Sequence, residues 1–250
     1  MRDRWIKHDS LTSTFTFISD LLKHQSLEEG TVVITDYQEA GRGQGEQSWL
    51  SPQGENLLMS LLLYPAFLSA SMQFHLSRVA SLALCDALGT LGIDSVIKWP
   101  NDILSGKGKI AGILIEHSIT AGTISHTIVG IGLNLNQTVF PSFKVPASSL
   151  RLETGKDADP AEVGELVENC LMNRYQALKK GSVESLEKSY MERLFRAGVP
   201  SRFKAGEEVF EGRIRGVSDF GELMVEHKGE IRTFGHGAIS MELSLTKSKR

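Results

Sequence analysis

Charged residues and glycines that could bind an anionic ligand gather in two short segments of this 250-residue chain. The first reads YQEAGRGQGEQSW over residues 37–49, and the second reads KWPNDILSGKGKIAG over residues 98–112. Glycines let backbone N–H groups approach an anion closely, while Arg42, Lys98 and Lys109 supply the balancing positive charge. Together the segments predict a site for a ligand that carries a phosphate or an acyl phosphate.

The glycine segment alone is also typical of a flexible loop. It lacks the Gly-Lys-Ser/Thr ending of a Walker A loop, and it matches no dinucleotide-binding fingerprint. Trp49 closes the segment. This residue favours a binding loop, because an indole beside a mobile glycine loop can cover a flat ligand.

The lysine segment has two interpretations. Asp102 could hold a magnesium ion, which takes one carboxylate together with substrate phosphates. The alternative is that Asn101 and Asp102 form a plain turn after Pro100. Lys109 opens an apolar strand, so its amine either lies at the edge of a buried site or extends back to solvent.

A third segment, GIGLN over residues 130–134, ends a predicted strand. Glycines weaken a strand unless another group approaches its backbone closely. A bound ligand would explain them, and Asn134 could then hydrogen-bond a base. A bulge at the end of the strand is the competing explanation.

The composition is that of an ordinary soluble protein, with 41% hydrophobic residues, 23% charged residues and a net charge of −3. This charge gives no support for a nucleic-acid-binding protein, which normally has a basic face. No apolar run reaches the length of a membrane span, and the N-terminus lacks a signal-peptide pattern. Cys85 and Cys170 fall within helical patterns, which indicates reduced core thiols and a cytoplasmic protein.

Apolar periodicity predicts the elements that must position these segments. The expected strands cover residues 31–37, 56–64, 95–99, 109–119 and 123–134, the last two joined as a hairpin through residues 121–122. The first expected helix begins behind a capping hydroxyl of the Ser13-Thr14 pair. A second spans 71–91 with Gly92 at the C-terminal cap. A third runs from Pro160 to about 180 after the N-cap Asp159, and a fourth follows residues 181–182 and ends near 198.

The residue pattern of the sequence changes after Pro200. Short apolar stretches separated by glycines predict short strands and a small β-barrel. We therefore expect a first domain over residues 1–198 and a second over residues 199–250.

In their order and spacing, these segments resemble the catalytic domain of biotin protein ligases, also called biotin–acetyl-CoA-carboxylase ligases. The match runs from Ser13 to about Asn136. In that family the glycine loop contains a second and a third arginine, which are Gln44 and Gln47 here. Phe15 stands where the family has asparagine.

The resemblance implies an α/β (α+β) fold like that of class II aminoacyl-tRNA synthetases. Its catalytic domain has a mixed, mainly antiparallel sheet, and a small C-terminal SH3-like β-barrel follows. It also implies ATP-dependent ligation with Mg2+: biotin is activated as biotinyl-5'-adenylate and then transferred to a lysine of a biotin carboxyl-carrier domain, the protein partner. Members of the family occur as monomers and as homodimers.

The resemblance also assigns roles to individual residues. The catalytic residues would be Lys109, Arg42 and Lys98. Biotin would contact Ser13, Thr14, Phe15, Gln38, Gly41, Arg42, Gly43, Gln44, Lys109 and Gly112. ATP or the adenylate would contact Arg42, Trp49, Lys98, Asn101 and Asn134, and Asp102 would bind the metal.

Three alternatives belong to other functional classes. A lipoate–protein ligase or octanoyltransferase shares the fold, but the Arg-Arg and triple-glycine segments of those families are not found here. A biotin-responsive repressor would need a DNA-binding domain before Ser13, where twelve residues are too few, so we expect no DNA partner. A non-catalytic nucleotide-binding module fits poorly with Lys109 and Asp102.

Overall fold

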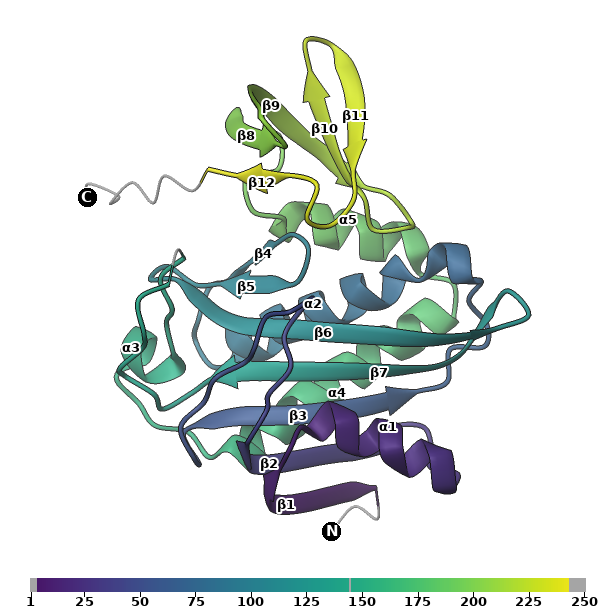
Figure 1. Ribbon diagram of the computed structural model, residues 1–250, viewed down its shortest axis with the longest axis vertical. Coiled ribbons are helices and arrows are strands. Elements are labelled where there is room, and N and C mark those ends of the chain that lie inside the picture. Colours follow the sequence, from purple (N-terminus) through teal and green to yellow (C-terminus); the bar gives the residue numbers. More distant parts are fainter. Residues whose placement is uncertain (1–3, 144, 243–250) are drawn as a thin grey trace.

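The computed structural model describes residues 4–143 and 145–242, which form two β-sheets flanked by helices (Figure 1). The first sheet has seven strands in the order β1-β2-β3-β7-β6-β5-β4. Its strands are β1 (Trp5–Leu11), β2 (Val32–Gln38), β3 (Asn56–Leu63), β4 (Val96–Lys98), β5 (Asp102–Leu104), β6 (Lys109–Thr120) and β7 (Thr123–Asn134). β1 and β2 pair in parallel and the other neighbours pair antiparallel, which confirms the predicted mixed, mainly antiparallel sheet.

The second sheet has five antiparallel strands in the order β11-β10-β9-β8-β12. These are β8 (Ser201–Ala205), β9 (Glu208–Val217), β10 (Leu223–His227), β11 (Glu230–Phe234) and β12 (Ser240–Met241). They confirm the expected small C-terminal β-structure. Phe203 and Val225 of this sheet belong to the same hydrophobic cluster as Leu57 of β3. A domain boundary at residues 198–199 therefore stays a prediction.

Helices cover both faces of the first sheet. The helices are α1 (Thr14–His24), α2 (Phe74–Thr90) after the short 3-10 helix η1 (Ala70–Met72), α3 (Leu150–Thr154), α4 (Pro160–Lys179) and α5 (Val183–Arg193). Alternate residues of β3 separate the faces: Leu61 packs in the cluster with α2 and α4, and Leu62 packs with Phe15 of α1. Figure 1 shows α1 in front of the sheet and α2 and α4 behind it.

Local signals predicted most of these elements correctly. The Asp159 side chain accepts hydrogen bonds from the backbone N–H groups of Ala161 and Glu162 and so caps α4. Ala121 and Gly122 have φ of 50° and 81°, values typical of the tight turn that joins β6 to β7. Gly92 follows α2 with φ of 81°.

Other expectations were wrong or incomplete. Ser13 is the N-cap residue of α1, but its side chain makes no capping hydrogen bond, so the predicted capping role is wrong. The strand β1 and the helix α3 were not predicted, and β5 replaces the plain turn considered for Asp102. Cys85 and Cys170 are free thiols, and no helix among the described residues is long and apolar enough to cross a membrane.

A histidine in β6 makes the stability of the fold depend on pH. Burial lowers the pKa of His117 from 6.5 to about 4, and its Nδ1 lies 2.9 Å from Thr127 Oγ1. As the pH falls from 6.5 towards 4, the unfolded chain binds a proton that the folded protein does not, so the free energy of unfolding decreases.

The measurement is urea unfolding at pH 7 and pH 5. We expect His117→Gln to lose less stability than the wild type between these two values. His24→Gln, at the exposed end of α1, is the control and should behave like the wild type. Equal losses in the wild type and His117→Gln would contradict the assignment.

Candidate active site

A cavity of about 550 Å3 opens on the face of the first sheet that carries α1. Its floor is formed by two pairs of directly opposed residues, Ser60 with Gly130 and Gly112 with Gly132. Opposed residues of neighbouring strands point to the same face of a sheet. Small residues at these four positions therefore leave that face hollow.

The strand register brings the lysine segment to the same hollow. Lys98 of β4 is opposite Asp102 of β5, and Asp102 is opposite Gly112 of β6. The three residues form one row across the sheet, which continues to Gly132 of β7. Segments that are separate in the sequence therefore meet through antiparallel pairing.

Asp102 is the centre of a charged cluster. Its side chain is 14% exposed, and its two oxygens lie 2.6 Å from Lys109 Nζ and 3.0 Å from Lys98 Nζ. Burial alone would raise the pKa of Asp102, but the charges and hydrogen bonds of Lys109 and Lys98 outweigh it and hold this pKa below 3.8. The carboxylate is therefore ionised at neutral pH, and the cluster as a whole carries positive charge.

The glycine segment folds back on itself as a small hairpin. Gly43 N donates to Gln47 O at 2.7 Å, and Trp49 N donates to Gly41 O at 2.9 Å. A Cβ atom added at Gly41 would lie 2.3 Å from Trp49 O, so this glycine is needed for the close approach of two backbone segments. Gly41 itself is not among the residues that line the cavity, and the proposed biotin contact there stays a prediction.

The Trp49 indole lies on the glycine floor. A Cβ atom at Gly132 would be 2.3 Å from Trp49 Cε2, and one at Gly112 would be 2.8 Å from Trp49 Cζ3. Lys109 Nζ lies 5.4 Å from the centroid of the indole, a cation–π distance. The glycines of β6 and β7 therefore accommodate an aromatic ring against the sheet.

Arg42 has two partners in the cavity region. Its Nη2 pairs with Glu116 Oε1, and its guanidinium carbon lies 4.9 Å from the centroid of the Phe15 ring. The arginine side chain is 44% exposed, so this ion pair is weak and screened by solvent. Arg42 can therefore exchange Glu116 for a ligand anion at little cost.

One end of the cavity is rich in small polar groups. Gln38 Oε1 accepts hydrogen bonds from Thr14 N at 2.8 Å and Thr14 Oγ1 at 3.1 Å, and Thr14 Oγ1 lies 2.8 Å from Ser60 Oγ. Ser13 Oγ, Gln44 Oε1 and Trp49 Nε1 are buried without a hydrogen-bond partner among the described residues. Buried polar groups normally have partners, so these three atoms indicate a ligand with a polar edge.

The two asparagines of the predicted site also support the backbone. Asn101 Nδ2 donates to Ile113 O, and Asn134 Nδ2 donates to Ser148 O, both at 2.9 Å. If Asn134 contacts adenine, its Oδ1 atom would therefore make the contact.

The structure brings almost the whole predicted site together. Residues that line the cavity as expected are Ser13, Thr14, Phe15, Gln38, Arg42, Gly43, Gln44, Trp49, Lys98, Asn101, Asp102, Lys109, Gly112 and Asn134. Lining residues without an assigned role include Met59, Ser60, Leu114, Ile131, Phe140, Phe143 and His236. Ser60 was detectable as a lone polar residue in an apolar strand. No local sequence signal marks His236 as a site residue.

Residues 7–134 match the biotin/lipoate A/B protein ligase family. The chain belongs to this family. It is 32% identical over 230 residues to the bifunctional ligase/repressor BirA of Bacillus subtilis, covering 90% of this chain and 70% of the relative. It is 33% identical over 200 residues to the biotin–[acetyl-CoA-carboxylase] ligase of Paracoccus denitrificans, covering 77% of this chain and 82% of the relative.

A solved structure shares the fold along nearly the whole chain. The biotin protein ligase of Aquifex aeolicus, in complex with biotin and ATP, superimposes with a TM-score of 0.78 at 28% identity. The match covers 97% of this chain and 100% of the other.

Proposed function

We propose that this protein is an ATP-dependent biotin–protein ligase. It activates biotin as biotinyl-5'-adenylate and transfers the biotinyl group to a lysine of a biotin carboxyl-carrier domain. One observation carries the proposal: a single cavity is lined both by unpartnered polar atoms and by a cluster with excess positive charge. The relatives named as biotin ligases favour biotin over lipoate as the acid that this cavity accepts.

Activation joins two anions, so cations must neutralise charge as the bond forms. The carboxylate oxygen of biotin attacks the α-phosphorus of ATP, and pyrophosphate leaves. Lys109 lies at the edge of the cavity floor and would contact the acyl-phosphate oxygens, while Lys98 and Arg42 would balance the remaining negative charge. Each of these groups acts most strongly where charge develops in the transition state.

Asp102 is the residue that would hold Mg2+, since it is the one carboxylate among the described lining residues. Mg2+ usually takes one or two protein carboxylates and fills its other positions with water and substrate phosphates, so this residue fits an ion that enters with ATP. Bound there, the ion would neutralise phosphate charge. Asp102 would first have to release Lys98 or Lys109, which occupy its oxygens.

The polar end of the cavity suits the ureido ring of biotin. That ring has donors and an acceptor in one plane, and Ser13, Thr14 and Gln38 offer complementary groups. Phe15, Gly43, Gln44 and Gly112 would line the rest of the biotin site. Trp49 and Asn134 would meet the adenylate, with Asn101 supporting the turn beside it.

Transfer needs a dry site and an exposed lysine. The neutral amine of the carrier lysine attacks the acyl carbon of the mixed anhydride, the amide bond forms as nitrogen loses a proton to solvent, and AMP leaves with the bonding electrons. Closure of the glycine hairpin over the adenylate would exclude water from an anhydride that hydrolyses readily. The proposed setting is the cytoplasm, where free Cys85 and Cys170 stay reduced, with the enzyme a monomer or a homodimer.

Pyrophosphate release tests the activation step. With ATP, Mg2+ and biotin the protein should release pyrophosphate and form biotinyl-adenylate, identified by mass. With lipoate or octanoate in place of biotin the rate should fall to background. Equal rates with lipoate would favour the lipoate–protein ligase alternative.

The glutamines of the loop predict how long the adenylate stays bound. Gln44 and Gln47 replace two cations of the family pattern, and a neutral amide holds a phosphate less strongly than a guanidinium does. We therefore expect Gln44→Arg to slow dissociation of biotinyl-adenylate by about tenfold, as one charge-assisted hydrogen bond would.

A chase experiment with labelled adenylate measures this rate, and Gln53→Arg, in the exposed turn before β3, is the control. An unchanged dissociation rate in Gln44→Arg would show that the missing arginines do not set adenylate retention.

A further inference from the structure

The second sheet contributes one side chain to the wall of the cavity. His236 lies between β11 and β12, and every other described lining residue lies before residue 148. Its side chain is exposed, so it stands at the mouth of the cavity rather than at the floor. A residue from a distant part of the chain therefore borders the same space as Lys98 and Asn101.

Trp99 connects this histidine to the lysine segment. The centroids of the Trp99 and His236 rings are 6.2 Å apart. Trp99 Nε1 donates a hydrogen bond of 2.9 Å to Gly221 O, in the turn between β9 and β10. Because Trp99 follows Lys98 directly, the position of the second sheet is tied to the charged cluster.

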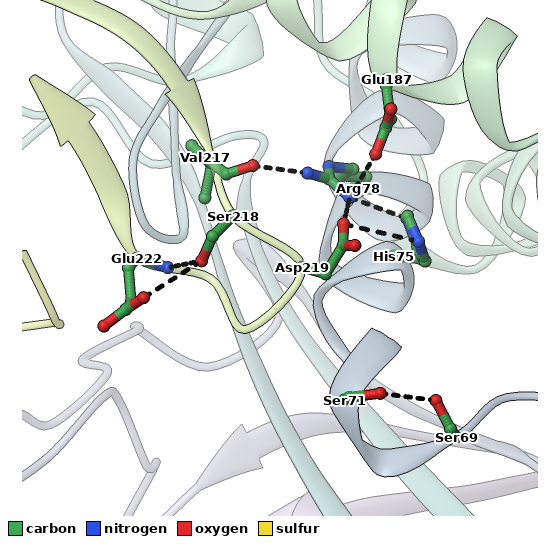
Figure 2. A network of polar contacts seen from close by, with 9 residues as sticks. All are labelled: Ser69, Ser71, His75, Arg78, Glu187, Val217, Ser218, Asp219 and Glu222. Atoms are coloured by element: carbon green, nitrogen blue, oxygen red, sulfur yellow. Dashed lines mark hydrogen bonds and ion pairs between the residues drawn. The ribbon is translucent and has the colours of Figure 1, made fainter. Parts of the chain in front are cut away.

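A buried arginine fixes the same turn to the helices (Figure 2). Arg78 of α2 is 4% exposed, donates to Val217 O at 2.6 Å and pairs with Asp219 and with Glu187 of α5, both at 3.2 Å. Phe74 N also donates to Asp219 O at 3.2 Å. Contacts from α2 and from Trp99 thus hold the β9–β10 turn in place, and Glu187 of α5 supports Arg78.

The group around Arg78 is an ion-pair network rather than a metal site. Ligand atoms of His75, Glu187 and Asp219 lie within 4.8 Å of one another, the spacing of a cation site. The Arg78 guanidinium already pairs with both carboxylates and lies 2.7 Å from His75 Nδ1. Arg78 therefore supplies the positive charge that a metal ion would otherwise bring to these carboxylates. Its function is to position the β9–β10 turn.

The strand order locates His236 relative to the two ends of the cavity. Ser13, Thr14 and Gln38, which are proposed to bind the ureido ring of biotin, lie at the start of α1 and on β2, whereas Lys98 lies on β4 at the far edge of the sheet. His236 stands beside Trp99 and therefore at the β4 end. With biotin at the α1–β2 end, the positive charge of Lys98 would favour the ATP phosphates at the β4 end.

We propose that His236 is a further substrate-contacting residue, which hydrogen-bonds the β- and γ-phosphates of ATP, the part that leaves as pyrophosphate. This inference rests on the proposed function. An imidazole offers at least one N–H donor in either protonation state, and phosphate oxygens are strong acceptors. Lys98 and Lys109 are already paired with Asp102, so few hydrogen-bond donors are left for the phosphates. His236 of the second sheet would add one donor.

The test compares His236→Ala with His227→Ala, a histidine of the same sheet whose Nδ1 lies 2.8 Å from Glu211 O, outside the cavity. Pyrophosphate release is measured against ATP and against biotin. We expect His236→Ala to raise the KM for ATP about tenfold, the worth of a hydrogen bond to a charged group, with the KM for biotin unchanged. His236→Gln should recover part of the loss, and His227→Ala should match the wild type.

Two results would overturn the inference. One is an unchanged KM for ATP in His236→Ala. The other is a defect confined to transfer from preformed adenylate to a carrier domain, which would make the histidine a base for the carrier lysine. A wild-type protein that releases no pyrophosphate with biotin would instead refute the proposed function itself, so the two failures are distinguishable.

Discussion

Lys109→Ala should lower the rate of biotinyl-adenylate formation by about 10²–10³-fold, the effect of removing one donor that stabilises transition-state charge. The lysine side chain is 31% exposed, and its amine lies 2.6 Å from Asp102 and faces the Trp49 ring. It is therefore held at the cavity edge where the acyl phosphate would form. Pyrophosphate release with saturating biotin and ATP measures the effect.

A matched control separates this role from a general effect of charge. Lys107 is exposed, two residues earlier, and donates to Leu152 O outside the cavity. Lys107→Ala should keep wild-type activity, and both variants should melt near the wild-type temperature. Normal pyrophosphate release by a folded Lys109→Ala would remove this lysine from the mechanism.

Asp102→Asn should have the second largest effect, a loss of about 10²-fold in adenylate formation. The carboxylate holds Lys98 and Lys109 from its two oxygens, and an amide of the same shape would leave two ammonium groups close together without a counter-charge. Displacement of catalytic groups by about 1 Å can cost 10²-fold in rate. The change also removes the carboxylate proposed to hold Mg2+.

The double variant tests whether the cluster acts as a unit. Groups that act together give losses that do not add, so Lys109→Ala/Asp102→Asn should be about as slow as Lys109→Ala alone. Asp94→Asn is the control, because Asp94 is 97% exposed and pairs with Arg193 away from the cavity. Losses in Lys109→Ala and Asp102→Asn that multiply in the double variant would contradict a shared role.

Local chemistry explains which parts of the fold were predictable. The Asp159 cap and the Ala121-Gly122 turn depend on neighbours in the sequence, and both were predicted correctly. The strand β1 was missed, because its burial pattern is irregular and its pairing partner β2 lies about 27 residues further along the chain. Parallel pairing at a sheet edge leaves no short-range signal.

The site shows the same division. Lys98, Asp102 and Lys109 were predicted from a compact segment whose residue types imply their chemistry. The row from Lys98 to Gly132 depends on strand register, which sequence spacing does not determine. Ser60 stands out as a lone polar residue in an apolar strand, but only tertiary packing brings it and His236 to the cavity, and no sequence pattern around His236 marks it as a site residue.

Transfer of biotin to a purified carrier domain is the decisive test of the proposed ligase activity. The protein is incubated with ATP, Mg2+, biotin and the carrier domain of a biotin-dependent carboxylase, and the mass of the carrier is measured by mass spectrometry. We predict one added biotinyl group, none on a carrier whose target lysine is replaced by arginine, and none with lipoate in place of biotin. An unmodified carrier in the presence of biotin, or equal modification with lipoate, would show that the protein is not a biotin–protein ligase.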